Sequence, residues 1–211
     1  MQGKFIVFEG CDFTGKSTQI KLVGEHLAKQ GIKYITTREP GGVPLAEEIR
    51  KLIMHEGKKA HKMTELLLFM AARCEHLFAK IMPALENGTW VLCDRFIPST
   101  LVYQGFLGGL DQEMIGKSHD LLFSNAVLPN LTLIFDMEPS AILERMTQKS
   151  LRGFNSYDSQ NLEQITKIRE GYLAYHKTDV NSKLINANQT EEMVLAEIIS
   201  QITLLLPPNQ P

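Results

Sequence analysis

The stretch GCDFTGKS, residues 10–17, decides how this 211-residue chain folds. It matches the pattern GxxxxGK[ST], whose glycines let backbone N–H groups converge on phosphate oxygens. The lysine of the pattern reaches the outer phosphates, and its last hydroxyl can bind Mg²⁺. The stretch follows an apolar run and opens a segment with helical periodicity, so the helix dipole adds to the field at the phosphates. We therefore expect a nucleoside triphosphate here, bound by Gly10, Cys11, Asp12, Phe13, Thr14, Gly15, Lys16, Ser17 and Thr18.

Five short apolar runs predict the strands of a sheet. They lie at residues 4–9, 34–37, 90–94, 131–136 and 183–187. Continuous apolarity of this length is typical of parallel strands that are buried on both faces. Helical segments alternate with the runs, at residues 17–30, 45–54, 64–86, 112–125, 139–148, 162–176 and 191–205. The alternation predicts an α/β fold, a five-stranded parallel sheet of the P-loop NTPase type with helices on both faces.

The length is close to that of one domain, at ~150 residues per domain. We expect residues 1–206 to form a single domain. A polar stretch at about residues 147–160 interrupts the alternation of strands and helices, and a short lid would lie there. Residues 207–211 are expected to be a disordered tail.

The composition narrows the range of partners. The chain has 22 basic and 24 acidic residues, so it has no global positive field to hold nucleic acid or an anionic membrane surface. Its three cysteines are scattered, which supports neither a disulfide framework nor a zinc site and fits a reducing, cytoplasmic setting. The longest apolar run, residues 66–72, is far shorter than the ~18 residues needed to cross a bilayer. We expect a soluble protein with small-molecule partners.

The pair Asp94-Arg95 ends the apolar run at residues 90–94. In open parallel sheets ligands bind beyond the carboxyl ends of the strands, so both side chains are expected near the phosphates. Asp94 is then a second Mg²⁺ ligand beside Ser17, and Arg95 adds a cation. No NKxD motif, with which GTPases read their base, occurs in the chain. The pair favours phosphoryl transfer between two anionic substrates. A solvated ion pair at the end of the strand is the alternative explanation for the same two residues.

Four further segments resemble the thymidylate kinase family. They are TREPGG at residues 37–42, FMAAR at 69–73, DRF at 94–96 and STLVYQG at 99–105, together with Glu9 before the phosphate loop. The resemblance covers roughly residues 4–205. It implies the fold given above and an enzyme that transfers the γ-phosphoryl group of ATP to dTMP, giving dTDP and ADP in dTTP synthesis. It also implies Mg²⁺ as the cofactor and a homodimer that associates through helices.

Phe69 and Arg73 lie four residues apart, so a ring and a guanidinium share one helix face and can contact one base. The resemblance implies that Phe69 stacks on thymine and that Arg73 donates to its O4. It places Thr100 and Gln104 around the base and sugar, and Tyr103 near the sugar C2′. The full set that it assigns to dTMP is Asp12, Arg38, Pro40, Phe69, Arg73, Arg95, Ser99, Thr100, Tyr103 and Gln104.

Arg38 and Arg95 resemble the family's pair for the dTMP phosphate, a role that suits the fixed charge and the fork of a guanidinium. Pro40 and the two glycines after it would hold Arg38 in a turn, although turn chemistry alone explains those residues equally well. A carboxylate inside a phosphate loop needs a balancing partner. The resemblance implies that Asp12 contacts the dTMP 3′-hydroxyl and the network of Mg²⁺ or the catalytic arginine.

Simple structural roles fit some of the same side chains. Phe69 could be a core residue, and Arg73 could form a surface ion pair with Glu65 or Glu75. The six histidines show no partner pattern and are expected at surface or packing positions; they are His26, His55, His61, His76, His119 and His176.

The expected catalytic residues are Lys16, Asp12, Arg95, Arg145, Lys149 and Arg152. Phosphoryl transfer depends on positioning and charge stabilisation, so cations around the triphosphate matter most. Phe13 stands where some family members carry a catalytic arginine, which leaves the lid cations as candidates. Arg145, Lys149 and Arg152 would share one helix face, although a solvated face has the same spacing. Residues 152–158, RGFNSYD, lack the Asp-Arg-x-Glu segment common in the family's lids. The sequence therefore does not decide which of the three cations approaches the transferred phosphoryl group.

Two other functions fit the phosphate loop. One is another nucleoside monophosphate or deoxynucleoside kinase, among which Arg38 and Arg95 favour a monophosphate acceptor. The other is a nucleotide-dependent switch or ATPase, which would release ADP without an acceptor. The apolar helix at residues 64–86 fits either a dimer contact or core packing within one subunit.

Overall fold

The computed structural model describes residues 3–55, 60–123, 128–150 and 161–206, without the side chains at positions 149 and 150. The strands in this part form one sheet in the order β2-β3-β1-β4-β5, and every neighbouring pair runs parallel. The strands are β1 (Phe5–Gly10), β2 (Tyr34–Arg38), β3 (Trp90–Asp94), β4 (Leu131–Asp136) and β5 (Ser182–Asn186). The predicted five-stranded parallel sheet is confirmed.

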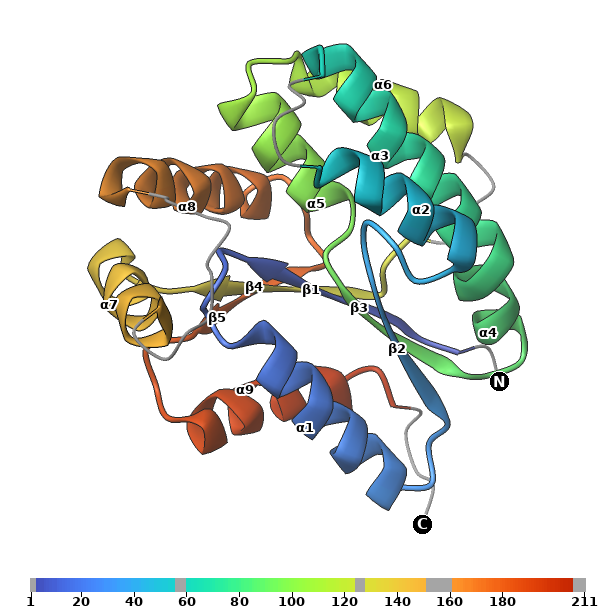
Figure 1. Cartoon of the computed structure of the whole chain (residues 1–211). Helices are drawn as coiled ribbons and strands as arrows, with labels where there is room; N and C mark the ends of the chain where they lie inside the picture. Colours follow the sequence, from blue (N-terminus) through green and yellow to red (C-terminus); the bar gives the residue numbers. More distant parts are fainter. Residues whose placement is uncertain (1–2, 56–59, 124–127, 151–160, 207–211) are drawn as a thin grey trace.

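Helices lie on both faces of the sheet, as predicted (Figure 1). α1 (Lys16–Lys29) and α9 (Glu191–Thr203) lie on one face, and α3 (Lys62–His76) and α8 (Leu162–His176) lie on the other. The remaining α-helices of the described part are α2 (Pro44–Ile53), α4 (Met82–Glu86), α5 (Ile97–Thr100), α6 (Gln112–Leu122) and α7 (Pro139–Ser150). Within the described residues, no helix combines the length and apolarity that crossing a membrane requires.

Strand β1 joins the two halves of the core. All its residues are buried. Ile6 and Phe8 belong to the apolar cluster that contains residues of α1, α8 and α9, whereas Phe5 and Val7 belong to the cluster that contains residues of α3. The period of two along the strand thus sends alternate side chains to opposite faces, and β1 holds the phosphate loop at the middle of the sheet.

The two edge strands differ from the prediction that all five strands are buried on both faces. β2 has no fully buried residue, and Lys183 and Leu184 of β5 are exposed. β2 and β5 end the strand order, so each has a neighbour on one side only. Runs of four or five residues in the sequence do not reveal which strand takes the edge.

Two helical segments depart from regular α-helical hydrogen bonding. The predicted helix at residues 64–86 contains a π-helical turn at Leu77–Ile81, between α3 and α4. A second π-helical turn, Leu101–Leu107, continues α5 and was not predicted. Pro98 and the glycines that follow the turn conceal its periodicity in the sequence.

Three predictions fall outside the described residues. They are the end of the predicted helix at 124–125, the central part of the lid at 151–160, and the tail at 207–211.

Gly10 makes the turn from β1 into the phosphate loop. Its φ is +131°, and a Cβ at this position would lie 2.7 Å from the backbone oxygen of Phe135 in the neighbouring strand β4. Gly15, with φ of +97°, comes directly before α1. Because left-handed backbone is readily accessible to glycine alone, the first and second glycines of the motif are required by the fold as well as by phosphate.

We expect Leu92→Ala to lower the free energy of unfolding by about 2–5 kcal/mol, because Leu92 lies in the middle of β3 and is fully buried. Urea denaturation followed by circular dichroism measures the change. Leu184→Ala is the matched control, because Leu184 lies on the edge strand β5 and is 37% exposed. Equal losses in the two variants would contradict the interior position of β3.

Candidate active site

The phosphate loop surrounds the amino group of Lys16. Nζ donates to the carbonyl oxygens of Gly10 at 3.0 Å and Cys11 at 2.8 Å. The hydroxyl of Thr14 donates to the same Cys11 carbonyl at 2.8 Å. Burial lowers the pKa of Lys16, and the charge of Arg95 adds to this effect. Lys16 is also the first residue of α1, so its amine lies where the helix dipole favours anions.

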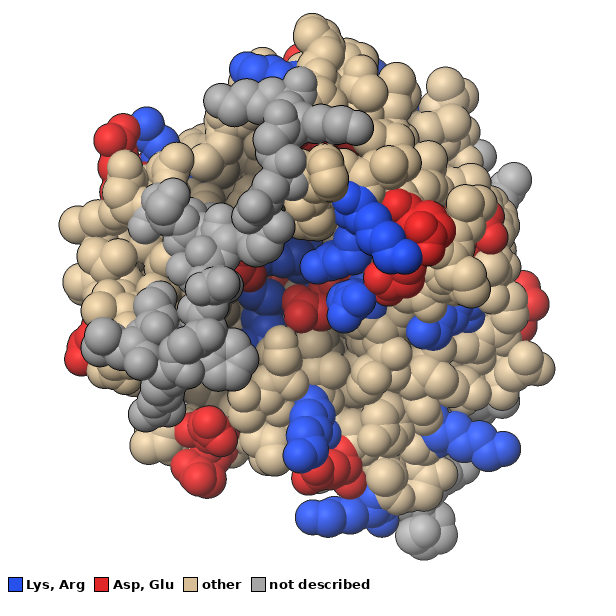
Figure 2. Space-filling view, in the orientation of Figure 1, with Lys and Arg blue, Asp and Glu red and all other residues tan. Residues whose placement is uncertain are grey.

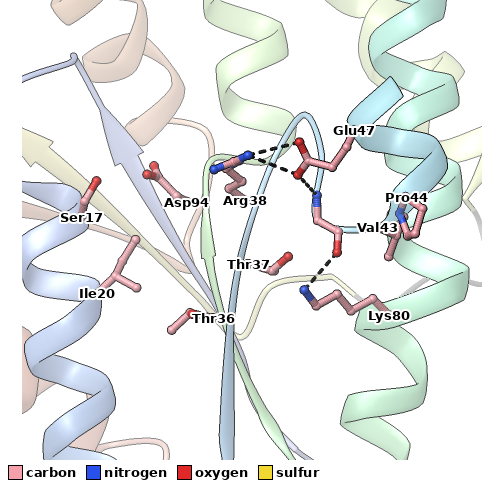
Figure 3. A pocket seen from close by; sticks show the side chains of 11 residues that line it. Ser17, Ile20, Thr36, Thr37, Arg38, Val43, Pro44, Glu47, Lys80 and Asp94 are labelled. Atoms are coloured by element: carbon pink, nitrogen blue, oxygen red, sulfur yellow. Dashed lines mark hydrogen bonds and ion pairs between the residues drawn. The ribbon is translucent and has the colours of Figure 1, made fainter. Parts of the chain in front are cut away.

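Ser17 and Asp94 line one cavity of about 590 Å³ beside the phosphate loop (Figure 3). In this view Asp94 lies between Ser17 of α1 and Arg38 of β2. Oδ1 of Asp94 is buried and has no hydrogen-bond partner among the described residues, an arrangement that is costly unless a ligand completes it. A hydroxyl and a carboxylate are oxygen donors of the kind that Mg²⁺ uses together with phosphate oxygens. These residues fit the predicted Mg²⁺ position.

A larger cavity, of about 740 Å³, lies next to the first, and Arg38 and Asp94 line both. All the residues that the sequence predicts for dTMP line it, namely Asp12, Arg38, Pro40, Phe69, Arg73, Arg95, Ser99, Thr100, Tyr103 and Gln104. On the face shown in Figure 2, basic and acidic side chains gather in a central hollow. The fold thus brings residues from distant segments into one site.

Arg73 is 2% exposed and lies on α3. Its Nε donates to Oε2 of Glu39 at 2.7 Å, and Nη2 donates to the Thr100 hydroxyl at 2.9 Å. The alternative of a surface ion pair with Glu65 or Glu75 is wrong, because the ion-pair partner is the buried Glu39. The guanidinium is therefore held rigidly at the cavity.

The other predicted base and sugar contacts surround Arg73. Phe69 is half-buried and lines the cavity, so it is not a fully enclosed core residue. Nε2 of Gln104 donates to Oε1 of Glu65 at 2.7 Å. The guanidinium of Arg95 lies over the ring of Tyr103, with Cζ 5.3 Å from the ring centroid. The π-helical turn at Leu101–Leu107 thereby carries two of the predicted contacts.

Arg95 leaves β3 through a sharp turn. Its φ is +71°, which is costly for a residue with a Cβ, and its N–H donates to the carbonyl of Phe8 at 2.9 Å. The side chain donates to Oδ1 of Asp12 at 2.6 Å and to the hydroxyl of Ser99 at 3.1 Å. It is 17% exposed, so it is not the solvated strand-end cation of the simpler alternative. The ion pair balances the carboxylate that Asp12 brings into the phosphate loop.

Arg38 ends β2 and pairs with Glu47 of α2. Nη2 lies 3.1 Å from Oε2 of Glu47, and Oε1 of Glu47 accepts from the N–H of Gly42 at 2.8 Å. This backbone hydrogen bond, helped by Arg38, lowers the pKa of Glu47. A Cβ on Gly42, whose φ is +88°, would lie 2.5 Å from Oγ1 of Thr37. The predicted tight turn after Arg38 is present, and the structure shows in addition that the Glu39–Pro40 peptide bond is cis.

Arg145 of α7 lies against the phosphate loop. Nη1 donates to the carbonyl of Phe13 and Nη2 to that of Ala187, both at 3.4 Å. The side chain of Lys149 and the whole of Arg152 lie outside the described residues. Of the three lid cations, the structure therefore places Arg145 alone, at the side of the predicted ATP site.

The sequence analysis assigned no role to two residues that organise this site. Glu9 is fully buried and accepts from the Phe96 N–H at 2.7 Å, the Ser99 hydroxyl at 2.6 Å and the Tyr172 hydroxyl at 3.1 Å. Tyr172 of α8 also accepts from Nη1 of Arg95 at 2.8 Å. Glu9 stands next to the motif, so its position was a usable signal, whereas Tyr172 shows only helical periodicity.

His76 was predicted at a surface or packing position without a partner pattern, and the structure gives it two polar partners. It is fully buried and hydrogen-bonds to Glu39 and Thr37. His76 lies three residues after Arg73 on the same helix, but its partners Glu39 and Thr37 lie 37 and 39 positions away in the sequence, so no local spacing connects them.

The sequence model of the thymidylate kinase family matches residues 8–198. Three similar proteins, each named thymidylate kinase, match nearly end to end. That of Shouchella clausii is 42% identical over 97% of both chains. That of Symbiobacterium thermophilum is 39% identical over 96% of this chain and 94% of its own, and that of Chlamydia abortus is 40% identical over 94% and 95%. With these matches and a phosphate loop beside a cavity lined by Phe69 and Arg73, the chain belongs to the thymidylate kinase family.

Proposed function

We propose that the larger cavity binds dTMP and the phosphate loop binds ATP, so that the γ-phosphoryl group passes between them and yields dTDP and ADP. Family membership makes the chain a dTMP kinase that uses ATP. The observation that supports this division of the site is that the two cavities share Arg38 and Asp94, next to the loop. Asp12 belongs to the loop and also lines the larger cavity, so both substrates meet at one carboxylate.

For dTMP, we propose that Phe69 stacks on the base and Arg73 donates to its O4. Arg95 and Arg38 would bind the phosphate. Arg95 is already held by Asp12 and suits a phosphate through its bidentate fork. Arg38 is exposed and paired with Glu47, a kind of pair that contributes little and can be exchanged for a ligand.

For ATP, we propose that Lys16 and the loop N–H groups of residues 10–18 bind the phosphates. Ser17 and Asp94 would hold Mg²⁺, which when bound neutralises charge on the β- and γ-phosphates. The dTMP phosphate is already a nucleophile, so the chain's contribution is alignment and positive charge rather than a general base.

We also propose a cytoplasmic location, because a reducing compartment keeps the thiols of Cys11, Cys74 and Cys93 free, as they are in the structure. Cell fractionation with an antibody to this chain would test it, and an exported form would contradict it.

We expect ADP release with Mg-ATP to be fastest with dTMP among dTMP, dUMP, dCMP, UMP, AMP, GMP and thymidine at equal concentration. The methyl group that dUMP lacks is worth about 1–3 kcal/mol in an apolar pocket, so dUMP should react more slowly. An amino group at position 4 of dCMP would face the donors of Arg73 and leave both without an acceptor, so its turnover should be negligible. A coupled ADP-release assay measures all seven.

The same assay separates the alternative functions. If another monophosphate were the preferred acceptor, the chain would still be a kinase, but the assignment of Phe69 and Arg73 to a thymine pocket would be wrong. ADP release that needs no acceptor would indicate an ATPase or a switch.

Arg145, Lys149 and Arg152 are the proposed sources of the cation beside the transferred group. Arg152→Ala should lower kcat while KM for dTMP stays nearly constant, because the charge acts mainly in the transition state. Initial rates over a dTMP series at saturating ATP measure the two parameters. A rise in KM for dTMP with unchanged kcat would count against a role in transfer.

We propose a homodimer that associates through α2 and α3. Leu45 and Leu52 of α2 and Leu67 of α3 are exposed large apolar side chains on neighbouring helices, as is typical of subunit contacts. Sedimentation velocity at micromolar concentration should show a dimer, and Leu67→Glu should shift it to monomer. A clean monomer of the unsubstituted chain would reject this proposal.

A further inference from the structure

A buried series of hydrogen bonds lies behind the proposed base pocket. Nε of Arg73 donates to Oε2 of Glu39 at 2.7 Å, and Nδ1 of His76 lies 3.1 Å from Oε1 of the same carboxylate. Nε2 of His76 lies 2.7 Å from Oγ1 of Thr37. Glu39, Arg73 and His76 are all buried. The series joins the end of β2 to α3, and the proposed transfer chemistry uses neither Glu39 nor His76.

The guanidinium of Arg73 divides its donors between the protein and the cavity. An arginine has five N–H donors and no acceptor. Nε is used by Glu39, one Nη2 hydrogen by Thr100 at 2.9 Å, and Nη1 lies 3.9 Å from Sδ of Met70. The remaining Nη hydrogens meet no acceptor among the described residues. Because Arg73 lines the larger cavity, these hydrogens are the ones left for a ligand.

Glu39 is itself held from several directions. Its N–H donates to the carbonyl of Asp94 at 2.9 Å, which places it directly beyond the β2–β3 pair. Burial alone would raise the pKa of Glu39, but Arg73 and His76 outweigh it and hold the pKa below its usual range. The carboxylate is therefore charged at neutral pH. Each of its oxygens accepts from one of the two partners, so it cannot turn without breaking one of these bonds.

His76 follows Arg73 by three residues, so both side chains lie on the same face of α3. A carboxylate can only accept, so Nδ1 of His76 carries the proton in this contact. In the neutral ring, Nε2 then accepts from the hydroxyl of Thr37. The imidazole thus connects the carboxylate of Glu39 to the side-chain hydroxyl of Thr37 in β2.

We infer that Glu39 and His76 are positioning residues for base selection, which fix the guanidinium of Arg73 so that it accepts a pyrimidine with a carbonyl at position 4 and rejects one with an amino group. The inference rests on the proposed function, in which Arg73 faces that position. A mobile arginine could withdraw from an amino group at little cost. A guanidinium that is held at Nε cannot withdraw, so its donors and those of the amino group stay unpaired, and the wrong base is penalised.

The test compares kcat/KM for dTMP with kcat/KM for dCMP in the unsubstituted enzyme and in Glu39→Gln, His76→Gln and Thr37→Val. The ratio of the two values does not depend on how much of the enzyme is folded, so a purely structural role would leave it unchanged. We expect the ratio to fall about tenfold or more in Glu39→Gln, because a hydrogen bond to a charged group is weakened. His76→Gln should lower it by a smaller factor. Thr37→Val, which nearly keeps the side-chain volume, should also lower the ratio. This variant provides the test if Glu39→Gln and His76→Gln do not fold.

His119→Gln is the matched control. His119 is a buried histidine whose ring contacts Phe96, and Phe96 in turn lies under the guanidinium of Arg73. The carboxylate beside its ring is that of Asp120 rather than Glu39, so the dTMP to dCMP ratio should keep its original value.

The outcomes distinguish this inference from the function on which it rests. An unchanged ratio in the Glu39 and His76 variants, or an equal fall in His119→Gln, would overturn the inference and leave the dTMP kinase intact. Equal turnover of dTMP and dCMP by the unsubstituted enzyme would overturn the base contact of Arg73 and this inference with it.

Discussion

The buried carboxylate of Glu9 is the group around which the site is built. A carboxyl group that is taken out of water must be hydrogen-bonded, and Glu9 meets this need with the N–H of Phe96 and the hydroxyls of Ser99 and Tyr172. Burial raises its pKa, and the charge of Arg95 opposes that rise. One side chain at the end of β1 thereby fixes the segment after β3 and the helix α8 relative to the phosphate loop.

Three of the arginines that line the larger cavity, Arg38, Arg73 and Arg95, are each paired with an acid, and these pairs differ in how deeply they are buried. The pair of Arg73 and Glu39 is buried and fixed. The pair of Arg38 and Glu47 is exposed, so water screens it and a ligand can replace the carboxylate. In the proposed function, selection of the base would benefit from the fixed guanidinium of Arg73, whereas binding of the phosphate would tolerate the more mobile one of Arg38.

The sequence predicted the sheet, the phosphate loop and the lining of the larger cavity, because apolar runs, the GxxxxGKS spacing and the family motifs are local patterns. The edge positions of β2 and β5 depend on strand order, which no single run contains. The contacts of Glu9 with Tyr172 and of Glu39 with His76 join residues 163 and 37 positions apart. Such contacts arise from tertiary packing, so neither Tyr172 nor His76 carried a signal that spacing could detect.

The π-helical turn at Leu101–Leu107 makes the lining of the larger cavity depend on the length of this segment. A π-helical turn contains one residue more than an α-helical turn. Loss of one residue would restore regular hydrogen bonding and rotate the side chains beyond it by about 100° around the helix axis. Tyr103 and Gln104, which line the cavity, would then change their direction relative to Thr100. Substitutions can adjust this pocket gradually, but an insertion or deletion here would exchange its lining in a single step.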